Sequence, residues 1–181
     1  MILVTGATGT VGRRVVARLT AAGHDVRAVV RDPSRAALPA GVPTVTADLA
    51  DPTTLRPHLG GVRAVFLIWP FVDPAATVQL APDLADVLAN AGSPRVVFLS
   101  AASAEADPNS FWAVVERALI ERDLPWTVLR PTGFATNTLG WAGLGRRYSR
   151  RGGCALATRC RGPLTDPRGR HRRGGGRGAD R

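Results

Sequence analysis

The sequence predicts an α/β fold built on a doubly wound parallel sheet. Short apolar runs alternate with helix-like segments from residue 2 to about residue 130. Residues 64–69 are continuously apolar, as is typical of a strand that is buried on both faces of a parallel sheet. Because each intervening helix returns the chain to the start of the next strand, this alternation favours parallel over antiparallel pairing.

Six strands are expected, at residues 2–5, 26–30, 44–47, 64–69, 96–99 and 126–129. The first helix is expected over 11–22, where apolar residues recur at helical spacing, and Gly23 is expected to cap its end. Three further helices are expected to begin at Asp-Pro pairs, because aspartate is a favoured N-cap and proline a favoured first helical residue. These pairs are residues 51–52, 73–74 and 107–108.

The turn between the first strand and the first helix carries glycines at positions 6, 9 and 12. A strand, a Gly-x-x-Gly-x-x-Gly turn and a helix in this order predict a dinucleotide site, with a plain structural turn as the alternative. Glycines allow the tight turn and the approach of backbone N–H groups to a pyrophosphate, and the helix N-terminus adds partial positive charge. The residues expected to contact the cofactor here are Gly6, Thr8, Gly9, Thr10, Val11 and Gly12.

The residue after the second expected strand bears on the choice of cofactor. An acidic side chain there would hold the ribose hydroxyls of NAD, whereas an arginine suits the 2′-phosphate of NADP. Arg31 occupies this position, and Arg35 or Arg13 could assist it. The sequence therefore favours NADP, with NAD as the alternative. Because Asp32 is adjacent, an ordinary solvated surface arginine is the other interpretation of Arg31.

The ends of three other strands supply further candidates, since ligands of such sheets bind beyond the carboxyl ends of the strands. Asp48, followed by Leu49, could accept a hydrogen bond from the adenine amino group or could be an ordinary turn aspartate. Trp69-Pro70 lies where the cofactor should pass, although Trp69 is equally well a core residue. Ser100 lies where a reductase would place a catalytic hydroxyl, or it caps the next segment.

Two further segments, Glu116-Arg117-Ala118-Leu119 and residues 125–134, accompany the glycine turn. Together these motifs resemble the NmrA-like group of atypical short-chain dehydrogenases, over residues 1–141. The resemblance implies a Rossmann fold that binds NAD(P)H. It implies either a reductase of quinone, azo or enone acceptors, or a redox sensor that binds the cofactor without turnover and acts on a protein partner. It also places Pro131, Thr132 and Phe134 near the nicotinamide, and Asn137 at the substrate mouth.

The usual catalytic pair of this group is missing. Catalytic members carry a Tyr or His and a Lys four residues apart, and these positions fall here on Pro108 and Trp112. The chain has no lysine, and its single tyrosine is Tyr148. The usual proton donor for carbonyl reduction is therefore absent. Hydride transfer to a quinone, flavin or azo acceptor could take its proton from water, so both reductase and non-catalytic functions stay open.

Residues 142–181 differ in composition from the rest of the chain. They carry the whole net charge of +10, whereas residues 1–141 hold equal numbers of arginines and acidic residues. Glycine and arginine dominate without any helical or strand period, so we expect a nucleotide-binding domain at 1–141 and a disordered tail at 142–181. The resemblance implies a substrate-covering region in place of this tail. We therefore expect the fold to be truncated there, and a shift of reading frame in the gene would explain the composition.

The arginines of the tail leave non-specific nucleic-acid binding open as a third function. Cys154 and Cys160 lack the partners of a metal site, so no metal is expected. No apolar run approaches the length of a membrane span, and no signal peptide is recognised. The sequence therefore predicts a cytoplasmic protein without a membrane association, whose partner is a small-molecule substrate or another protein.

Overall fold

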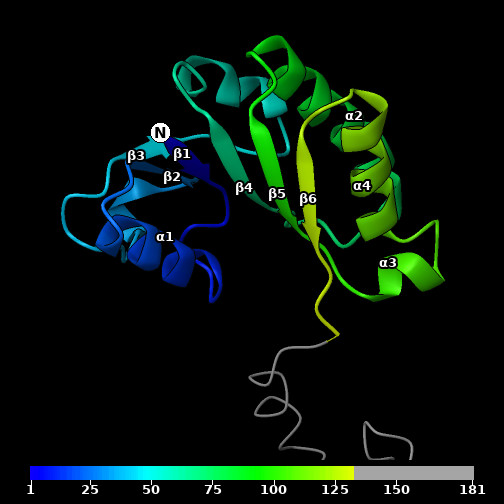
Figure 1. Ribbon diagram of the computed structural model, residues 1–181, viewed down its shortest axis with the longest axis horizontal. Coiled ribbons are helices and arrows are strands. Elements are labelled where there is room, and N and C mark those ends of the chain that lie inside the picture. Colours follow the sequence, from blue (N-terminus) through cyan, green and yellow to red (C-terminus); the bar gives the residue numbers. More distant parts are fainter. Residues whose placement is uncertain (133–181) are drawn as a thin grey trace, which may run out of the picture. The chain divides into compact units, whose positions relative to one another are not determined.

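The computed structural model describes residues 1–132, which form one six-stranded sheet with helices on both faces (Figure 1). The sheet order is β3-β2-β1-β4-β5-β6, and all neighbouring strands are parallel. The predicted doubly wound parallel sheet is confirmed, and each predicted strand is present within one residue of its expected bounds. The strands are β1 (Ile2–Val4), β2 (Val26–Val30), β3 (Thr44–Thr46), β4 (Ala64–Ile68), β5 (Arg95–Leu99) and β6 (Trp126–Leu129).

The helices are α1 (Gly12–Ala21), α2 (Pro74–Asn90), α3 (Ser103–Ala106) and α4 (Phe111–Glu121), with 3-10 helices η1 (Pro33–Arg35) and η2 (Pro52–His58). Gly23 ends α1 as predicted. Its φ is 76°, and the N–H of His24 donates to the carbonyl oxygen of Leu19, which closes the helix end. The helix expected after residues 51–52 is the 3-10 helix η2, and Pro57 lies inside it.

The prediction that a helix begins at Asp107-Pro108 is wrong about its first turn. The side chain of Asp107 accepts a hydrogen bond from the N–H of Asn109 at 2.9 Å and closes a turn. Ser110 then caps α4, because its hydroxyl oxygen accepts from the N–H of Ala113 at 3.3 Å. Both residue types are favoured N-caps, so the local sequence offered two starts three residues apart.

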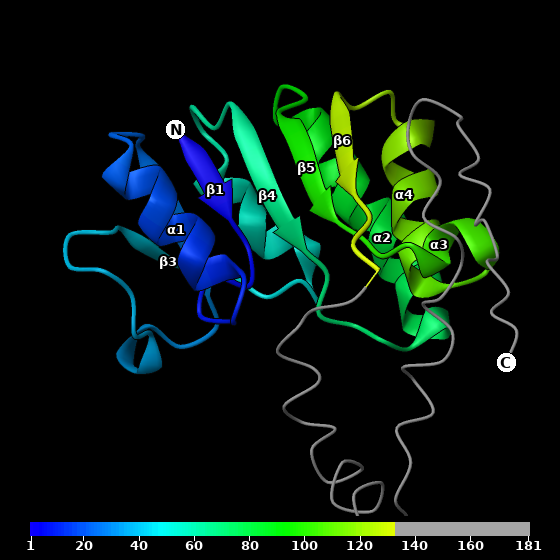
Figure 2. The ribbon, with the colours of Figure 1, turned by 60° about the horizontal axis from the view of Figure 1, so that its bottom comes forward.

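The two faces of the sheet are covered unequally. The larger hydrophobic core lies between the sheet and α2, η2 and α4, and includes the fully buried Phe98 and Leu88. A smaller core lies under α1 on the opposite face, around Val4 and Val16 (Figure 2). Burial of these apolar faces is the main stabilising contribution to the fold.

β4 is half-buried on one face, in contrast to the prediction that it is buried on both. Val65 and Leu67 belong to the larger core, whereas the alternate residues Phe66 and Ile68 keep part of their surface. The reason is that α1 packs over β1 and β2. Within the described part of the chain, no helix covers that face of β4, β5 and β6 (Figure 2).

The strand order places a switch point between β1 and β4. From β1 the chain proceeds through β2 to β3 on one side, and then returns to β4, β5 and β6 on the other. A crevice opens between the carboxyl ends of two strands from which the connections diverge in this way. The glycine turn follows β1, so it lies at this crevice.

Among residues 1–132, no helix is both long enough and apolar enough to cross a bilayer. The same residues contain no group of three or more His, Cys, Asp or Glu side chains that could hold a metal ion.

Candidate functional site

The parallel sheet brings most of the predicted site residues to a single edge. Each follows the carboxyl end of a strand, and carboxyl ends of parallel strands share one edge of the sheet. The residues at this edge are Gly6, Arg31, Asp48, Leu49, Trp69, Pro70, Ser100, Pro131 and Thr132. Phe134 and Asn137 lie outside the described residues.

The glycine turn is anchored to the neighbouring strand by Thr5. Its hydroxyl accepts from the N–H of Ile68 at 2.8 Å and donates to the carbonyl oxygen of Ile68 at 3.1 Å. Gly6 follows with a φ of 56°, a conformation that favours glycine, and a Cβ there would lie 3.0 Å from the Cβ of Ile68. The ends of β1 and β4 are therefore joined where the turn begins.

Gly12 lies at the closest approach between α1 and the turn. A Cβ on Gly12 would overlap the carbonyl oxygen of Gly6 and lie 2.9 Å from the Cα of Ala7. These obstacles are backbone atoms, so no side-chain movement could relieve them. A Cβ on Gly9 would lie 3.2 Å from the same carbonyl oxygen, which is a milder crowding. The third glycine is thus the one required for packing the helix against the turn.

The N-terminus of α1 has no side-chain cap. Asp73 and Ser110 cap α2 and α4, and Asp32 and Asp51 cap η1 and η2, whereas α1 and the four-residue α3 have no side-chain cap. Three consecutive N–H groups at this end donate to no other atom of residues 1–132. They belong to Thr10, Val11 and Gly12. Free N–H groups at a helix N-terminus are suited to bind an anion such as a pyrophosphate.

The residues after β2 divide their roles. Asp32 accepts hydrogen bonds from the N–H of Ser34 at 3.0 Å and from its hydroxyl at 2.6 Å, and so caps η1. Arg31 is exposed and forms no ion pair with another described residue. The carboxylate is therefore engaged locally, while the guanidinium is accessible.

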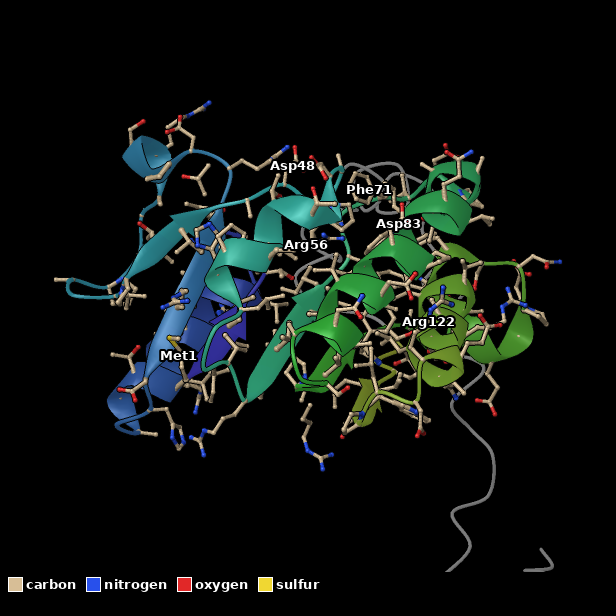
Figure 3. All side chains as sticks on the ribbon, turned by 90° about the horizontal axis from the view of Figure 1, so that it is seen from above. Met1, Asp48, Arg56, Phe71, Asp83 and Arg122 are labelled. Atoms are coloured by element: carbon tan, nitrogen blue, oxygen red, sulfur yellow. The ribbon has the colours of Figure 1, made fainter. Side chains whose placement is uncertain are left out.

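Asp48 and Leu49 follow β3 on the loop that leads to η2. Asp48 is exposed (Figure 3), and its Oδ1 accepts from the N–H of Ala50 at 3.0 Å, as in a turn aspartate. Its Oδ2 accepts no hydrogen bond from residues 1–132. Leu49 is buried in the larger core. A contact between Asp48 and an adenine stays a prediction.

The side chain of Trp69 lies in the core. It is 3% exposed, its Nε1 donates to the hydroxyl of Thr77 at 3.0 Å, and its ring packs edge-on against Phe71 at 5.1 Å. Pro70 is exposed immediately after it. A direct role for the Trp69 ring in cofactor binding has no support from this position, and that of Pro70 stays a prediction.

Ser100 belongs to a polar cluster with Glu116 and Arg130. Its hydroxyl donates to Oε1 of Glu116 at 2.5 Å. Arg130 makes a two-pronged contact with the same carboxylate, from Nε to Oε1 at 3.1 Å and from Nη2 to Oε2 at 2.6 Å. Ser100 and Glu116 are 2% and 7% exposed. The Ser100 hydroxyl is thus buried and already engaged, which leaves its predicted catalytic role without support from this geometry.

The charge of Glu116 is stabilised by its partners. Burial acts to raise the pKa of Glu116, but the hydrogen bonds from Arg130 and Ser100 and the charge of Arg130 together lower it below its ordinary value. The hydrogen bond to Glu116 in turn raises the pKa of Arg130. The pair is therefore ionised at neutral pH.

Sequence reasoning assigned no physical role to Thr5, Glu116 or Arg130. One signal was available for Glu116, which lies on α4 between the buried Val115 and Ala118. A charged residue on a core-facing position needs a partner, because an unpaired buried charge is strongly destabilising. The sequence did not indicate which cation that partner would be.

Comparison with known proteins identifies the family of this chain. A family of proteins described as NAD(P)H-binding matches residues 6–147. The chain belongs to this family. The resemblance to NmrA-like, atypical short-chain dehydrogenases is thereby confirmed, together with the Rossmann fold that it implies.

Two curated proteins are similar to this chain. It is 41% identical over 151 residues to (4-alkanoyl-5-oxo-2,5-dihydrofuran-3-yl)methyl phosphate reductase of Streptomyces griseus, covering 78% of this chain and 51% of that protein. It is 35% identical over 148 residues to the NAD(P)H azoreductase of Xenophilus azovorans, with the same coverage of 78% and 51%. The chain thus spans about half the length of the curated relatives it matches.

The fold is also similar to that of a solved structure. The NADPH-dependent quinone oxidoreductase of Escherichia coli, in complex with NADPH, superposes with a TM-score of 0.72 at 27% sequence identity. The match covers 82% of this chain and 55% of that protein.

Proposed function

We propose that this protein binds NADPH at the carboxyl edge of its sheet and acts as an NADPH-dependent reductase of a quinone, azo or enone acceptor. The observation that carries the proposal is the start of α1, where the cap is missing and three N–H groups have no acceptor among residues 1–132. These groups fit a pyrophosphate, and the glycines leave room for its approach. The named reductases among its relatives support the class of reaction.

The residues after β2 support NADPH over NADH. An NAD site uses a free acidic side chain to hold the ribose hydroxyls, whereas Oδ1 of Asp32 already accepts two hydrogen bonds from Ser34. Arg31 offers an accessible guanidinium, which suits the 2′-phosphate of NADPH.

The proton needed for reduction has no evident donor among the described side chains. NADPH would supply a hydride, and the acceptor also needs one proton to complete the two-electron reduction. Trp112 occupies the position of the usual lysine and packs against Phe98 and Phe111. The hydroxyl of Ser100 donates a hydrogen bond to Glu116, and Ser100 is buried. We therefore infer that water protonates the reduced acceptor, which suits quinones and azo groups better than unactivated ketones.

The same observation favours a second candidate, a redox sensor that binds NADP(H) without turnover. The site would then select the reduction state of the cofactor and pass it to a protein partner. Cofactor binding is common to both candidates, and only turnover distinguishes them.

A titration followed by an activity assay tests these proposals. Purified full-length protein is titrated with NADPH, NADP⁺ and NADH by fluorescence, and quinones and azo dyes are then added while NADPH consumption is followed. Binding with turnover supports the reductase, and binding without turnover for any acceptor supports the sensor. Folded protein that binds none of the three nucleotides would overturn both.

A further inference from the structure

We propose that Glu116 is a positioning residue for the nicotinamide half of the site, acting through Arg130 and Ser100 on the backbone of residues 130–132. This inference rests on the proposed binding of NADPH. It goes further by giving a role to a buried carboxylate that does not itself face the ligand.

The geometry of the cluster joins three elements at one point. Both oxygens of Glu116 accept hydrogen bonds, from the residue that follows β5 and from the residue that follows β6. Glu116 itself is on α4, behind the sheet. Its carboxylate therefore links the ends of β5 and β6 through side chains.

Backbone hydrogen bonds continue this link beyond the strands. The N–H of Ser100 donates to the carbonyl oxygen of Leu129 at 2.9 Å, and the N–H of Ala102 donates to that of Pro131 at 3.0 Å. The cluster lies directly beside this ladder. Pro131 is thus held at the carboxyl edge by the hydrogen bond from Ala102, and the preceding residue Arg130 is held by its two contacts with Glu116.

Stability alone is a weak explanation for such a cluster. An ion pair whose carboxylate is buried, as Glu116 is, often contributes little to stability, because the desolvation of that carboxylate offsets the attraction between the charges. What the fork adds is geometry, since a two-pronged arginine–carboxylate contact fixes both position and orientation. Such fixed geometry is useful for holding residues in place around a bound cofactor.

The position of the cluster assigns it to one half of the ligand. A dinucleotide lies across the switch point, with one half over each set of strands. The glycine turn and Arg31 follow β1 and β2, so they belong to the half that would hold the pyrophosphate and the 2′-phosphate of the adenosine. The cluster is at β5 and β6, on the other side of the switch point. Its loss should therefore weaken binding of the whole dinucleotide while sparing a fragment that lacks the nicotinamide.

The experiment compares two ligands on full-length protein. NADPH and 2′,5′-ADP are titrated by calorimetry into the wild type and into Glu116→Gln, after circular dichroism has established that the variant is folded. We expect NADPH binding to weaken about tenfold, as the loss of about one well-placed hydrogen bond to the ligand would cause, and 2′,5′-ADP binding to stay unchanged.

Asp86→Asn is the matched control. Arg122, which follows α4, forms a similar two-pronged contact with Asp86 on α2, at 2.8 and 3.2 Å, but the side chain of Asp86 is 53% exposed. Its removal should leave both affinities unchanged. Equal NADPH affinity in Glu116→Gln and wild type would overturn the inference, as would a parallel loss of both ligands.

Arg130→Lys provides a second measurement if Glu116→Gln does not fold. Lysine keeps the charge but cannot form the fork, so we expect the same selective loss of NADPH affinity. Unchanged NADPH affinity in this variant would count against the inference. Wild-type protein that binds neither ligand would instead contradict the proposed function, so the two failures are distinguishable.

Discussion

The two halves of the carboxyl edge are built by opposite means. After β1, three glycines leave the turn with few side chains, and the N–H groups at the start of α1 have no side-chain cap. After β5 and β6, in contrast, the polar groups are paired with one another. Both oxygens of the Glu116 carboxylate accept hydrogen bonds, and the Ser100 hydroxyl donates one of them. The first half offers free donors to a ligand, whereas the second holds the backbone in place.

This difference predicts in which half a substitution destabilises the fold least. An atom added at Gly12 collides with backbone, which cannot move aside. Removal of the Glu116 carboxylate leaves one partner, Arg130, partly accessible to water, since its side chain is 40% exposed. The first half should therefore tolerate no side chain at Gly12, whereas the second half should become less ordered without unfolding.

The largest effect is expected from Gly12→Ala. The new Cβ would overlap the carbonyl oxygen of Gly6, so we expect a loss of about 3 kcal/mol in the free energy of unfolding. NADPH binding should be lost with it, because α1 can no longer begin against the turn. Urea unfolding and fluorescence titration measure the two effects.

Gly60→Ala is the control for this substitution, because a Cβ at Gly60 would meet nothing within 4 Å. Gly9→Ala should be intermediate, with a contact of 3.2 Å. Equal stability and affinity in all three variants would show that the close approach at Gly12 is not what shapes the turn.

The next effect concerns the pH dependence of stability and probes the second half. Because its pKa is lowered in the folded protein, Glu116 stabilises the fold fully above its ordinary pKa, and this contribution is lost as pH falls through the lowered value. We expect Glu116→Gln to be about 2 kcal/mol less stable than wild type at pH 7, and the difference to shrink below about pH 4. Urea unfolding from pH 3 to pH 7 measures it. A difference that is constant with pH would mean that the ionised pair contributes nothing specific.

A smaller effect on the first half is expected from Arg31→Gln. Loss of a charged donor to the 2′-phosphate should weaken NADPH binding about tenfold and leave NADH binding unchanged. Arg18→Gln, in the last turn of α1 at the opposite edge of the sheet, is the control. If both nucleotides weaken equally in Arg31→Gln, the arginine acts on general charge and not on the 2′-phosphate.

The smallest effect is expected from Asp86→Asn. This carboxylate is 53% exposed, and screened surface pairs contribute little, so the free energy of unfolding should fall by less than about 0.5 kcal/mol. A chemical denaturation curve at neutral pH measures it. A loss as large as that of Glu116→Gln would remove the distinction between the buried and exposed forks on α4.

Much of the fold was predictable because its signals are local. Apolar runs and capping residues located all six strands and the start of α2, and the glycine spacing located the turn before α1. The error at Asp107 arose because two good N-caps lie three residues apart, and local sequence does not rank them. The half-buried face of β4 was missed for another reason. An apolar run reports that a strand suits burial, not which helix is present to cover it.

The site divides in the same way. Spacing along the chain was sufficient to place Gly6, Gly9 and Gly12 in a turn and Arg31 at the end of a strand, because both depend on neighbours in sequence. The pairing of Glu116 with Ser100 and Arg130 was not accessible in this way, since these residues lie 16 and 14 positions apart and meet only when β5, α4 and β6 pack together. Burial then raises the cost of an unpaired charge, and this cost selects the partners. Chain-local patterns therefore determine where the glycine turn and Arg31 lie, and the packing of distant segments determines how the residues that follow β5 and β6 are joined.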